Sequence, residues 1–398
     1  MKDMKRLLLS LVILTMCLSG CAQAKKDVYQ SSDTTDFTAI VSSDLHFTLD
    51  PDSASTVVPA EPYSREFMEA FVSQVIAEHP NVFILTGDNT NTGNPDDERA
   101  LASILERVRD AGIPVVMTAG NHDYDFSDAD TYEENYASLL DMEDRDPSSL
   151  SYVRRIGDVT LLAMDDGAVD QGRTPQFSKE TMKWLKEKLQ EASLRNDKII
   201  FLAHRSILYK ADDERYASYH IQNEGLYDLL VKYHVQLALT GHQHHPSILV
   251  KDSLHEIISG MPLTDTHCFG VLSIMGKDVS FSTEPIDFSA YGSQQCVSDM
   301  AAADQQAVDN QLATVEELLK NAESDPLYEQ GKSLLLNIFT ALKEGSLGAQ
   351  AGTFQADPAL ALVQAQLADT NYGPWLNDLL ASPPADPNHL SFVWQDDR

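Results

Sequence analysis

Short apolar runs alternate with amphipathic stretches along most of the chain from residue 37 onward. In the first part of this pattern, amphipathic periodicity predicts helices at residues 64–79, with Ser64 as the N-cap, and at residues 97–110. Apolar runs beside these helices predict strands at residues 37–41, 82–85 and 114–117. This strand–helix–strand–helix–strand order predicts a largely parallel sheet with helices packed outside it.

The alternation continues into the second part of the chain. Two apolar runs joined by a Gly-Asp pair predict a hairpin of residues 152–156 and 159–164. Further helices are predicted at residues 178–190 and 224–233, and further strands at residues 198–203, 235–240, 247–251, 254–259, 269–275 and 279–284. We therefore assign residues 37–285 to one α/β domain.

The composition changes near residue 286. Residues 286–398 contain 16 acidic and 4 basic residues, are rich in Ala and Gln, and show few strand patterns. Helical periodicity is present at residues 314–320 and 334–343. We expect this segment to be an acidic, mainly helical extension that packs against the main domain. The sequence does not identify a protein partner for it.

The charge of the chain restricts its partners. With 398 residues, of which 43% are hydrophobic, the chain can bury a large core. Its formal net charge of −32 disfavours nucleic-acid backbones and anionic membrane surfaces, and we expect no nucleic-acid binding. The same charge repels phosphate, so a phosphate site needs its own positive charge, which bound divalent metals supply.

The N-terminus has the pattern of a processing signal. Basic residues precede an apolar run at residues 7–18, which is too short to span a bilayer. The run ends in Leu18-Ser19-Gly20-Cys21, which resembles the bacterial lipobox. The resemblance implies that residues 1–20 are cleaved, that Cys21 carries lipid, and that residues 21–36 tether an exported protein to the cell membrane. An ordinary secretory signal, cleaved near Ala22 or Ala24, is the alternative.

Two further cysteines, Cys268 and Cys296, follow the predicted signal and the predicted lipid attachment site. Export permits a disulfide between Cys268 and Cys296, but two free thiols are an equal alternative. Neither cysteine has the spacing of a metal ligand, such as Cys-x-x-Cys, so we exclude both from the candidate site.

Five short motifs follow predicted strands in a fixed order. They are Asp44-Leu45-His46, Gly87-Asp88-Asn89, Gly120-Asn121-His122-Asp123, His204 and Gly241-His242-Gln243-His244. Each motif alone is typical of a turn, a helix cap or a packed histidine. Loops at the carboxyl ends of strands gather at one edge of an α/β sheet, so the five motifs are expected to converge. Carboxylate, amide and imidazole ligands suit Mn, Fe or Zn, and a shared carboxylate can hold two ions about 3.5–4 Å apart.

These motifs together resemble the calcineurin-like metallophosphoesterase superfamily over roughly residues 37–285. The resemblance implies a β-sandwich flanked by helices in αββα layers and two divalent or trivalent metal ions. It implies one metal held by Asp44, His46, Asp88 and His244, and a second held by Asp88, Asn121, His204 and His242. His122 would stabilise the transition state or protonate the leaving oxygen, and Asp123 would orient His122.

Details of the motifs modify this picture. The family often has Pro where this chain has Ser206, two residues after His204. Ser43 before the first motif and the Gly-Asn-His-Asp block are most similar to the cyclic-nucleotide phosphodiesterase-like branch. Arg205 is a candidate phosphate contact beside His204. We interpret Asp165 and Asp166, at the end of a predicted strand, as structural.

Two functions are consistent with the sequence. The first is an exported, lipid-anchored phosphoesterase that hydrolyses a small phosphodiester by direct attack of a metal-bridging hydroxide. A phosphomonoesterase or pyrophosphatase with the same fold is the alternative within this class. The second function is a surface binding lipoprotein that keeps the metal fold and uses its acidic helical tail to hold a partner. The complete ligand set, with His122 present, favours the enzyme.

Overall fold

The computed structural model describes residues 36–50, 58–264 and 266–396. The predicted cleavable segment 1–20, the predicted lipid attachment site Cys21 and almost all of the predicted tether 21–36 lie outside the described residues. Among the helices that the structure describes, none is long and apolar enough to cross a membrane.

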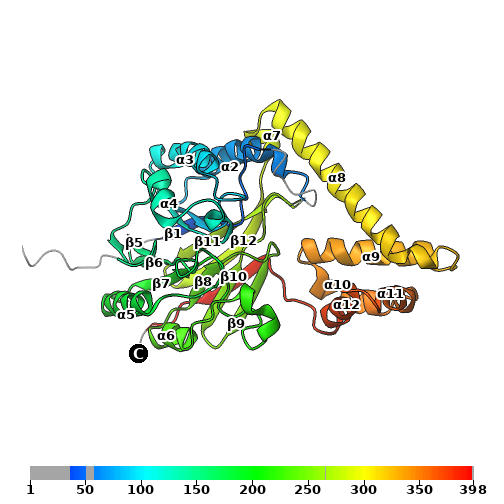
Figure 1. Ribbon diagram of the computed structural model, residues 1–398. Coiled ribbons are helices and arrows are strands. Elements are labelled where there is room, and N and C mark those ends of the chain that lie inside the picture. The colour runs from blue at the N-terminus through cyan, green and yellow to red at the C-terminus, as the bar shows by residue number, and fades with distance from the viewer. Residues whose placement is uncertain (1–35, 51–57, 265, 397–398) are drawn as a thin grey trace, which may run out of the picture. The chain divides into compact units, whose positions relative to one another are not determined.

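The first of two sheets has a parallel half and an antiparallel half (Figure 1). Its parallel strands are β1 (Phe37–Ser42), β2 (Val82–Thr86) and β3 (Val115–Thr118). Its antiparallel strands are β11 (Cys268–Met275), β12 (Asp278–Pro285) and β13 (His389–Val393). The sheet order is β13-β12-β11-β1-β2-β3. Only a two-residue turn joins β11 to β12, and a turn this short forces an antiparallel pair.

The second sheet has the order β4-β5-β6-β7-β8-β10-β9. Its strands are β4 (Asp144–Arg145), β5 (Tyr152–Ile156), β6 (Val159–Ala163), β7 (Lys198–Leu202), β8 (Leu237–Thr240), β9 (Ser247–Lys251) and β10 (Leu254–Ile258). β5 and β6 form the predicted hairpin. Strand order along the sequence predicted a largely parallel sheet, whereas the protein has two mixed sheets. The parallel strands form one half of the first sheet and the centre of the second.

Apolar side chains fill the space between the sheets and also cover both outer faces. Val41 and Ile84 from the first sheet meet Leu202 and Leu239 from the second in one buried cluster. The outer face of the first sheet packs under α2 (Ser64–Glu78), α3 (Pro95–Asp110) and α4 (Ala129–Tyr136). The outer face of the second packs under α5 (Lys179–Leu194) and α6 (Leu226–Lys232). These are the αββα layers that the resemblance implied, and burial on both faces explains the continuous apolar runs of the central strands.

The start of α2 differs from the prediction. Tyr63, not Ser64, occupies the N-cap position, and Ser64 is the first helical residue. The Ser64 hydroxyl donates to the Thr48 carbonyl at 2.8 Å and accepts from the Thr48 amide at 3.0 Å. Ser64 therefore holds the loop that follows the first motif, a contact that local sequence periodicity does not encode.

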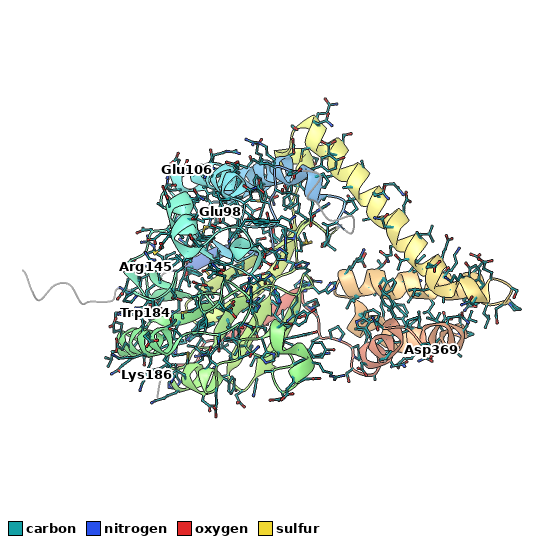
Figure 2. All side chains as sticks on the ribbon, in the orientation of Figure 1. Glu98, Glu106, Arg145, Trp184, Lys186 and Asp369 are labelled. Carbon is teal, nitrogen blue, oxygen red and sulfur yellow. The ribbon has the colours of Figure 1, made fainter. Side chains whose placement is uncertain are left out.

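In its described residues, the C-terminal segment forms six α-helices, of which the first and the start of the second pack in the core of the main domain, while the last five share a small core. The six helices are α7 (Phe288–Tyr291), α8 (Gln294–Leu319), α9 (Tyr328–Lys343), α10 (Leu347–Gln355), α11 (Leu360–Leu367) and α12 (Tyr372–Ala381). Val315, Leu335, Ile338 and Val363 are fully buried in this core. No acidic side chain that the structure describes between residues 286 and 396 is buried, and Asp369, after α11, is one exposed example (Figure 2). The predicted helix 314–320 is the end of a 26-residue helix.

The chain then returns to the main domain. Strand β13, which the sequence pattern did not predict, pairs with β12, and Trp394 joins the cluster between the sheets. Nε2 of Gln236 donates to the Gln395 carbonyl at 2.7 Å, and Oε1 of Gln236 accepts from the Gln395 amide at 2.9 Å, which fixes the end of the chain. Truncation at residue 285 would therefore remove a strand from the first sheet as well as the helices.

Candidate metal centre

The five motifs all lie directly after strands. Asp44 and His46 follow β1, and Asp88 follows β2. Asn121 and His122 follow β3, whereas the later histidines follow β7 and β8. The structure brings these side chains from two different sheets to one edge of the sandwich. Candidate ligand atoms form two groups, each with all atoms within 4.8 Å of one another.

The first group contains Asp44, His46, Asp88 and His244. The Nε2 atoms of His46 and His244 lie 3.1 Å apart, and Nε2 of His244 lies 3.4 Å from Oδ1 of Asp44. Oδ2 of Asp88 lies 3.8 Å from Nε2 of His46. Imidazole nitrogens and carboxylate oxygens that converge in this way have the donor chemistry of a metal site.

The second group contains Asp88, His204 and His242, so Asp88 belongs to both. Nε2 of His204 lies 3.1 Å from Oδ2 of Asp88 and 3.2 Å from Nδ1 of His242. Oδ2 of Asp88 and Oδ1 of Asn121, the expected ligand that follows β3, are both buried without a hydrogen-bond partner among the described residues. Since buried oxygens rarely stay unpaired, these orphaned acceptors fit metal ligands. The residues present therefore fit two metal ions that share Asp88.

Backbone strain marks the same residues. A non-glycine residue in the left-handed region is uncommon and costs free energy, and such residues cluster at functional sites. Five of the candidate ligands adopt a positive φ, namely Asp44 (53°), His46 (42°), Asp88 (49°), His242 (70°) and His244 (57°). The loops thus hold strained conformations that aim the side chains at one point.

Glycines in the motifs permit close packing of the ligand loops. A Cβ on Gly120 would lie 2.3 Å from the backbone nitrogen of Asp88, and a Cβ on Gly241 would lie 1.8 Å from Oγ of Ser43. Both distances are impossible for a real side chain. Each glycine therefore lets one ligand loop lie directly against another.

Hydrogen bonds and burial set the protonation of the ligands. Nδ1–H of His204 donates to the Thr86 carbonyl at 2.9 Å, which leaves Nε2 to face the metal position. Burial lowers the pKa of His46 to about 4 and that of His242 to about 3, which keeps both rings neutral. Burial opposes the charge of Asp44, but a hydrogen bond from His244 and the charge of His204 outweigh it and lower the pKa of Asp44 to about 2. Neutral imidazoles and ionised carboxylates are the forms that bind metals.

His122 lies beside the ligands but belongs to neither group. Its ring is 4.7 Å from the ring of His46, and its side chain is 37% exposed. Nδ1–H donates to the Asn91 carbonyl at 2.8 Å, and Nδ1 also lies 3.7 Å from Oδ2 of Asp125. The arrangement leaves Nε2 as the nitrogen that can exchange a proton with a bound molecule.

The structure corrects the role expected for Asp123. This carboxylate is buried and does not orient His122: Oδ2 accepts from the amides of Gly120 and Asn89, and Oδ1 accepts from the amide of Thr90. Both oxygens are used to join the second and third motif loops. Asn91 and Asp125 contact His122 instead, and neither was singled out from the sequence. The sequence signal that could have indicated Asp125 was its spacing, because a carboxylate three residues after His122 can contact that histidine in a helical turn.

The structure also corrects the role expected for Arg205. Its guanidinium is buried, with Nη1 3.1 Å from Oδ1 of Asp166 and Nη2 donating to the Gly172 carbonyl at 2.6 Å. Arg205 is therefore a structural partner of Asp166 and not a phosphate contact. Asp165 accepts hydrogen bonds from Tyr124 and the Leu150 amide, in agreement with the structural interpretation of this acidic pair.

Two further residues near the centre were not predicted. The Tyr219 ring lies 5.4 Å from the ring of His242 and is 39% exposed. Glu256 accepts from Ser206 and from the amides of Ile207 and Leu208, and so anchors the loop after His204. Neither residue stands in a motif, and only the fold places it here.

The two cysteines that the structure describes do not form a disulfide. Cys268 and Cys296 are free thiols, and the sulfur of Cys268 donates to the Thr266 carbonyl. The sulfur of Cys296 donates instead to the Glu66 carbonyl at 3.5 Å. Of the two alternatives left open by the sequence, the structure has the free thiols.

Comparisons with known proteins agree with this geometry. Residues 37–246 match the family model described as calcineurin-like phosphoesterase. The structure is similar to that of a dimetal phosphatase from Danio rerio, with a TM-score of 0.51 and 12% identity over 63% of this chain and 96% of that one. A purple acid phosphatase from yellow lupin seeds has a TM-score of 0.46 and 13% identity over 67% of this chain and 53% of that one. Similarity at these identities concerns the fold alone. No curated protein matches the sequence.

Proposed function

The chain belongs to the calcineurin-like phosphoesterase family, and we propose that it is a lipid-anchored, exported enzyme that hydrolyses a phosphodiester at the metal centre. The observation that carries the proposal is the position of Asp88, which is shared by both ligand groups while His122 stays outside them. The shared carboxylate suits a two-metal hydrolase, and the free histidine suits a proton donor. Two cations, when bound, neutralise phosphate oxygens and lower the pKa of water.

The residues of the chain supply the remaining steps. Asp44 and Asp88 would hold the cations, which would offset the repulsion between the phosphate and the negative net charge of the protein. His122, when protonated, gives the Nε2 proton to the leaving oxygen, and its hydrogen bond to the Asn91 carbonyl keeps the ring in place. Phosphorus is attacked directly by water, so no covalent enzyme intermediate is formed.

The preference for a diester rests on charge. Arg205, the basic residue expected beside the phosphate, is neutralised by Asp166. A diester carries one negative charge and a monoester up to two, so a site with less basic side-chain charge favours the diester. A phosphomonoesterase or pyrophosphatase is the alternative within the same chemistry.

The enzymatic proposal has a direct test. Purified residues 22–398 with Mn²⁺ are expected to hydrolyse bis-p-nitrophenyl phosphate, lose activity with a chelator, and regain it when Mn²⁺ is restored. A higher kcat/KM for p-nitrophenyl phosphate or for inorganic pyrophosphate would select the monoesterase or pyrophosphatase. If none of the three substrates is hydrolysed in a metal-dependent way, the enzymatic proposal is overturned. The binding lipoprotein is then the remaining function.

Export and lipid attachment have their own test. The lipobox-like residues before Cys21 support both. Cells that express the full chain with labelled palmitate should give a labelled protein in the membrane fraction, and Cys21→Ser should abolish the label. An unlabelled protein released from the cell would instead support the ordinary secretory signal.

A further inference from the structure

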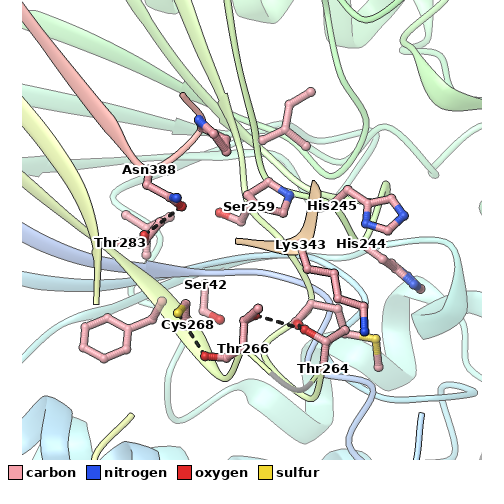
Figure 3. Close-up of a pocket in the computed structure, with 18 of the residues that line it drawn as sticks. Ser42, His244, His245, Ser259, Thr264, Thr266, Cys268, Thr283, Lys343 and Asn388 are labelled. Carbon is pink, nitrogen blue, oxygen red and sulfur yellow. Dashed lines mark hydrogen bonds between the residues drawn. The ribbon is translucent and has the colours of Figure 1, made fainter. Parts of the chain in front are cut away.

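A cavity of about 370 Å³ opens beside the metal centre (Figure 3). It lies at the end of the sandwich, and His244 and His245 line one side of it. Strands of the first sheet contribute Cys268 and Thr283, and the end of β10 is followed by Ser259 on the opposite side. Because His244 also belongs to the first ligand group, the cavity and the metal position share a side chain.

Two serine hydroxyls in this cavity have no partner. Ser42 is 2% exposed and Ser259 is 9% exposed, and Oγ of each has no hydrogen-bond partner among the described residues. Buried hydroxyls are nearly always paired, so two orphans on the walls of one cavity indicate that a bound molecule supplies the missing hydrogen bonds.

The helical segment closes this cavity. Lys343 at the end of α9 and Asn388 before β13 form part of its wall. Nδ2 of Asn388 donates to the Glu344 carbonyl at 2.7 Å, and the Thr283 hydroxyl donates to Oδ1 of Asn388 at 2.9 Å. These bonds join the end of α9, the approach to β13 and strand β12. The C-terminal segment is thereby part of the wall next to the metal centre.

The lining indicates an uncharged occupant. Lys343 and Glu344 both line the cavity and their formal charges cancel, and the Lys343 ammonium donates to Oε1 of Gln311 at 2.8 Å. The other walls combine hydroxyl groups, such as Thr264 and Thr266, with apolar side chains such as Met261 and Phe281. This mixture matches an organic group that has both apolar surface and hydroxyl or amide groups.

We propose that the cavity binds one organic substituent of the phosphodiester, an uncharged group with hydroxyl or amide functions, while the phosphate lies at the metals. The inference rests on the proposed function and adds a substrate class to it. Ser42 and Ser259 make hydrogen bonds to this substituent, and the C-terminal segment determines which substituents fit.

The test uses the full-length chain with Mn²⁺ and three p-nitrophenyl phosphodiesters. Their second substituent is methyl, glyceryl or 5′-thymidyl, so the leaving group is constant. We expect kcat/KM for the glyceryl or thymidyl ester to exceed that of the methyl ester at least 10-fold, through a lower KM. Ser259→Ala should reduce this ratio at least fivefold, and Ser259→Leu, which fills the cavity, should reduce it to about one.

Ser280→Ala is the matched control, because Ser280 is exposed on β12 and does not line the cavity. Ser280→Ala should keep the same ratio of kcat/KM between the larger esters and the methyl ester as the unsubstituted protein. If Ser259→Leu fails to fold, Ser259→Ala and Ser42→Ala decide, since each removes one unpaired hydroxyl and neither adds volume. Equal kcat/KM for all three esters, or a ratio unchanged by these variants, would overturn the inference while hydrolysis of the methyl ester leaves the proposed function intact. Absence of turnover of every ester would instead overturn the proposed function.

Discussion

Oδ2 of Asp88 and Nε2 of His204 lie 3.1 Å apart in the interior of the ligand cluster, although their strands belong to different sheets. Burial and the carboxylate oppose each other at this pair: burial would lower the pKa of His204, but the charge of Asp88 outweighs it and raises that pKa to about 9. Such a pair is stable without metal only as an ion pair. A cation bound at this position would take the place of the His204 proton.

Removing the shared carboxylate should therefore release both metals. We expect Asp88→Asn to lower kcat by at least about 10³-fold, because it removes a ligand from both groups. Metal analysis of the purified protein should show fewer than one ion per chain. Asp278→Asn, at an exposed position on β12, is the control. Retention of two ions by Asp88→Asn would contradict the shared role.

Replacing His122 should separate metal binding from catalysis. His122→Ala is expected to keep both metals, since His122 belongs to neither ligand group. Loss of a general acid lowers kcat by about 10²–10⁴-fold. The loss should be large for diesters with alkyl leaving groups and small for p-nitrophenyl esters, whose leaving group needs little protonation. An equal loss for both kinds of ester would show that His122 does not protonate the leaving oxygen.

Replacing Arg205 should affect stability and leave substrate affinity unchanged. Arg205→Met leaves the buried carboxylate of Asp166 without its ion partner, which costs about 3–5 kcal/mol of unfolding free energy. Urea unfolding should detect this loss, and the double variant with Asp166→Asn should recover part of it. Arg215→Met, at an exposed pair with Asp213, is the control. A 10-fold rise in KM for bis-p-nitrophenyl phosphate would instead indicate a phosphate contact.

The carboxyl group of Glu98 should make stability depend on pH. Burial outweighs the hydrogen bond from Asn135 and raises the pKa of Glu98 from 4.5 to about 7. Between these two pH values the folded chain keeps a proton that the unfolded chain loses. The contribution of Glu98 is therefore most favourable below about pH 4.5, and stability is lost as the pH rises to about 7.

Glu98→Gln removes this dependence. Relative to the unsubstituted protein, its unfolding free energy should rise by up to about 3 kcal/mol between pH 4.5 and pH 8. Urea unfolding at both pH values measures the difference. Glu106→Gln, at a half-buried position on the same helix, is the control (Figure 2). Identical pH dependence in Glu98→Gln and the unsubstituted protein would contradict the shifted pKa.

The sequence by itself determined most helices and strands of residues 37–285 and the order of the motifs. Strand and helix periods are local, so β1, β2 and α3 begin and end close to their predicted residues. Ligand types are also local, and a motif after a strand must lie at the end of that strand. For this reason Asp44, Asp88 and His204 could be placed near one another before the structure was known.

Tertiary structure decided what each polar side chain contacts. The partner of Arg205 is 39 residues away, and Asp123 joins loops that are about 30 residues apart in the chain. The local hydrophobic periodicity of the sequence does not predict such pairings, because they form only when elements distant in the sequence pack together. Strand β13 has the same origin: it becomes a strand by pairing with β12 more than a hundred residues earlier. The metal ligands are thus a property of the motifs, whereas the shape of the cavity beside His244 is a property of the fold.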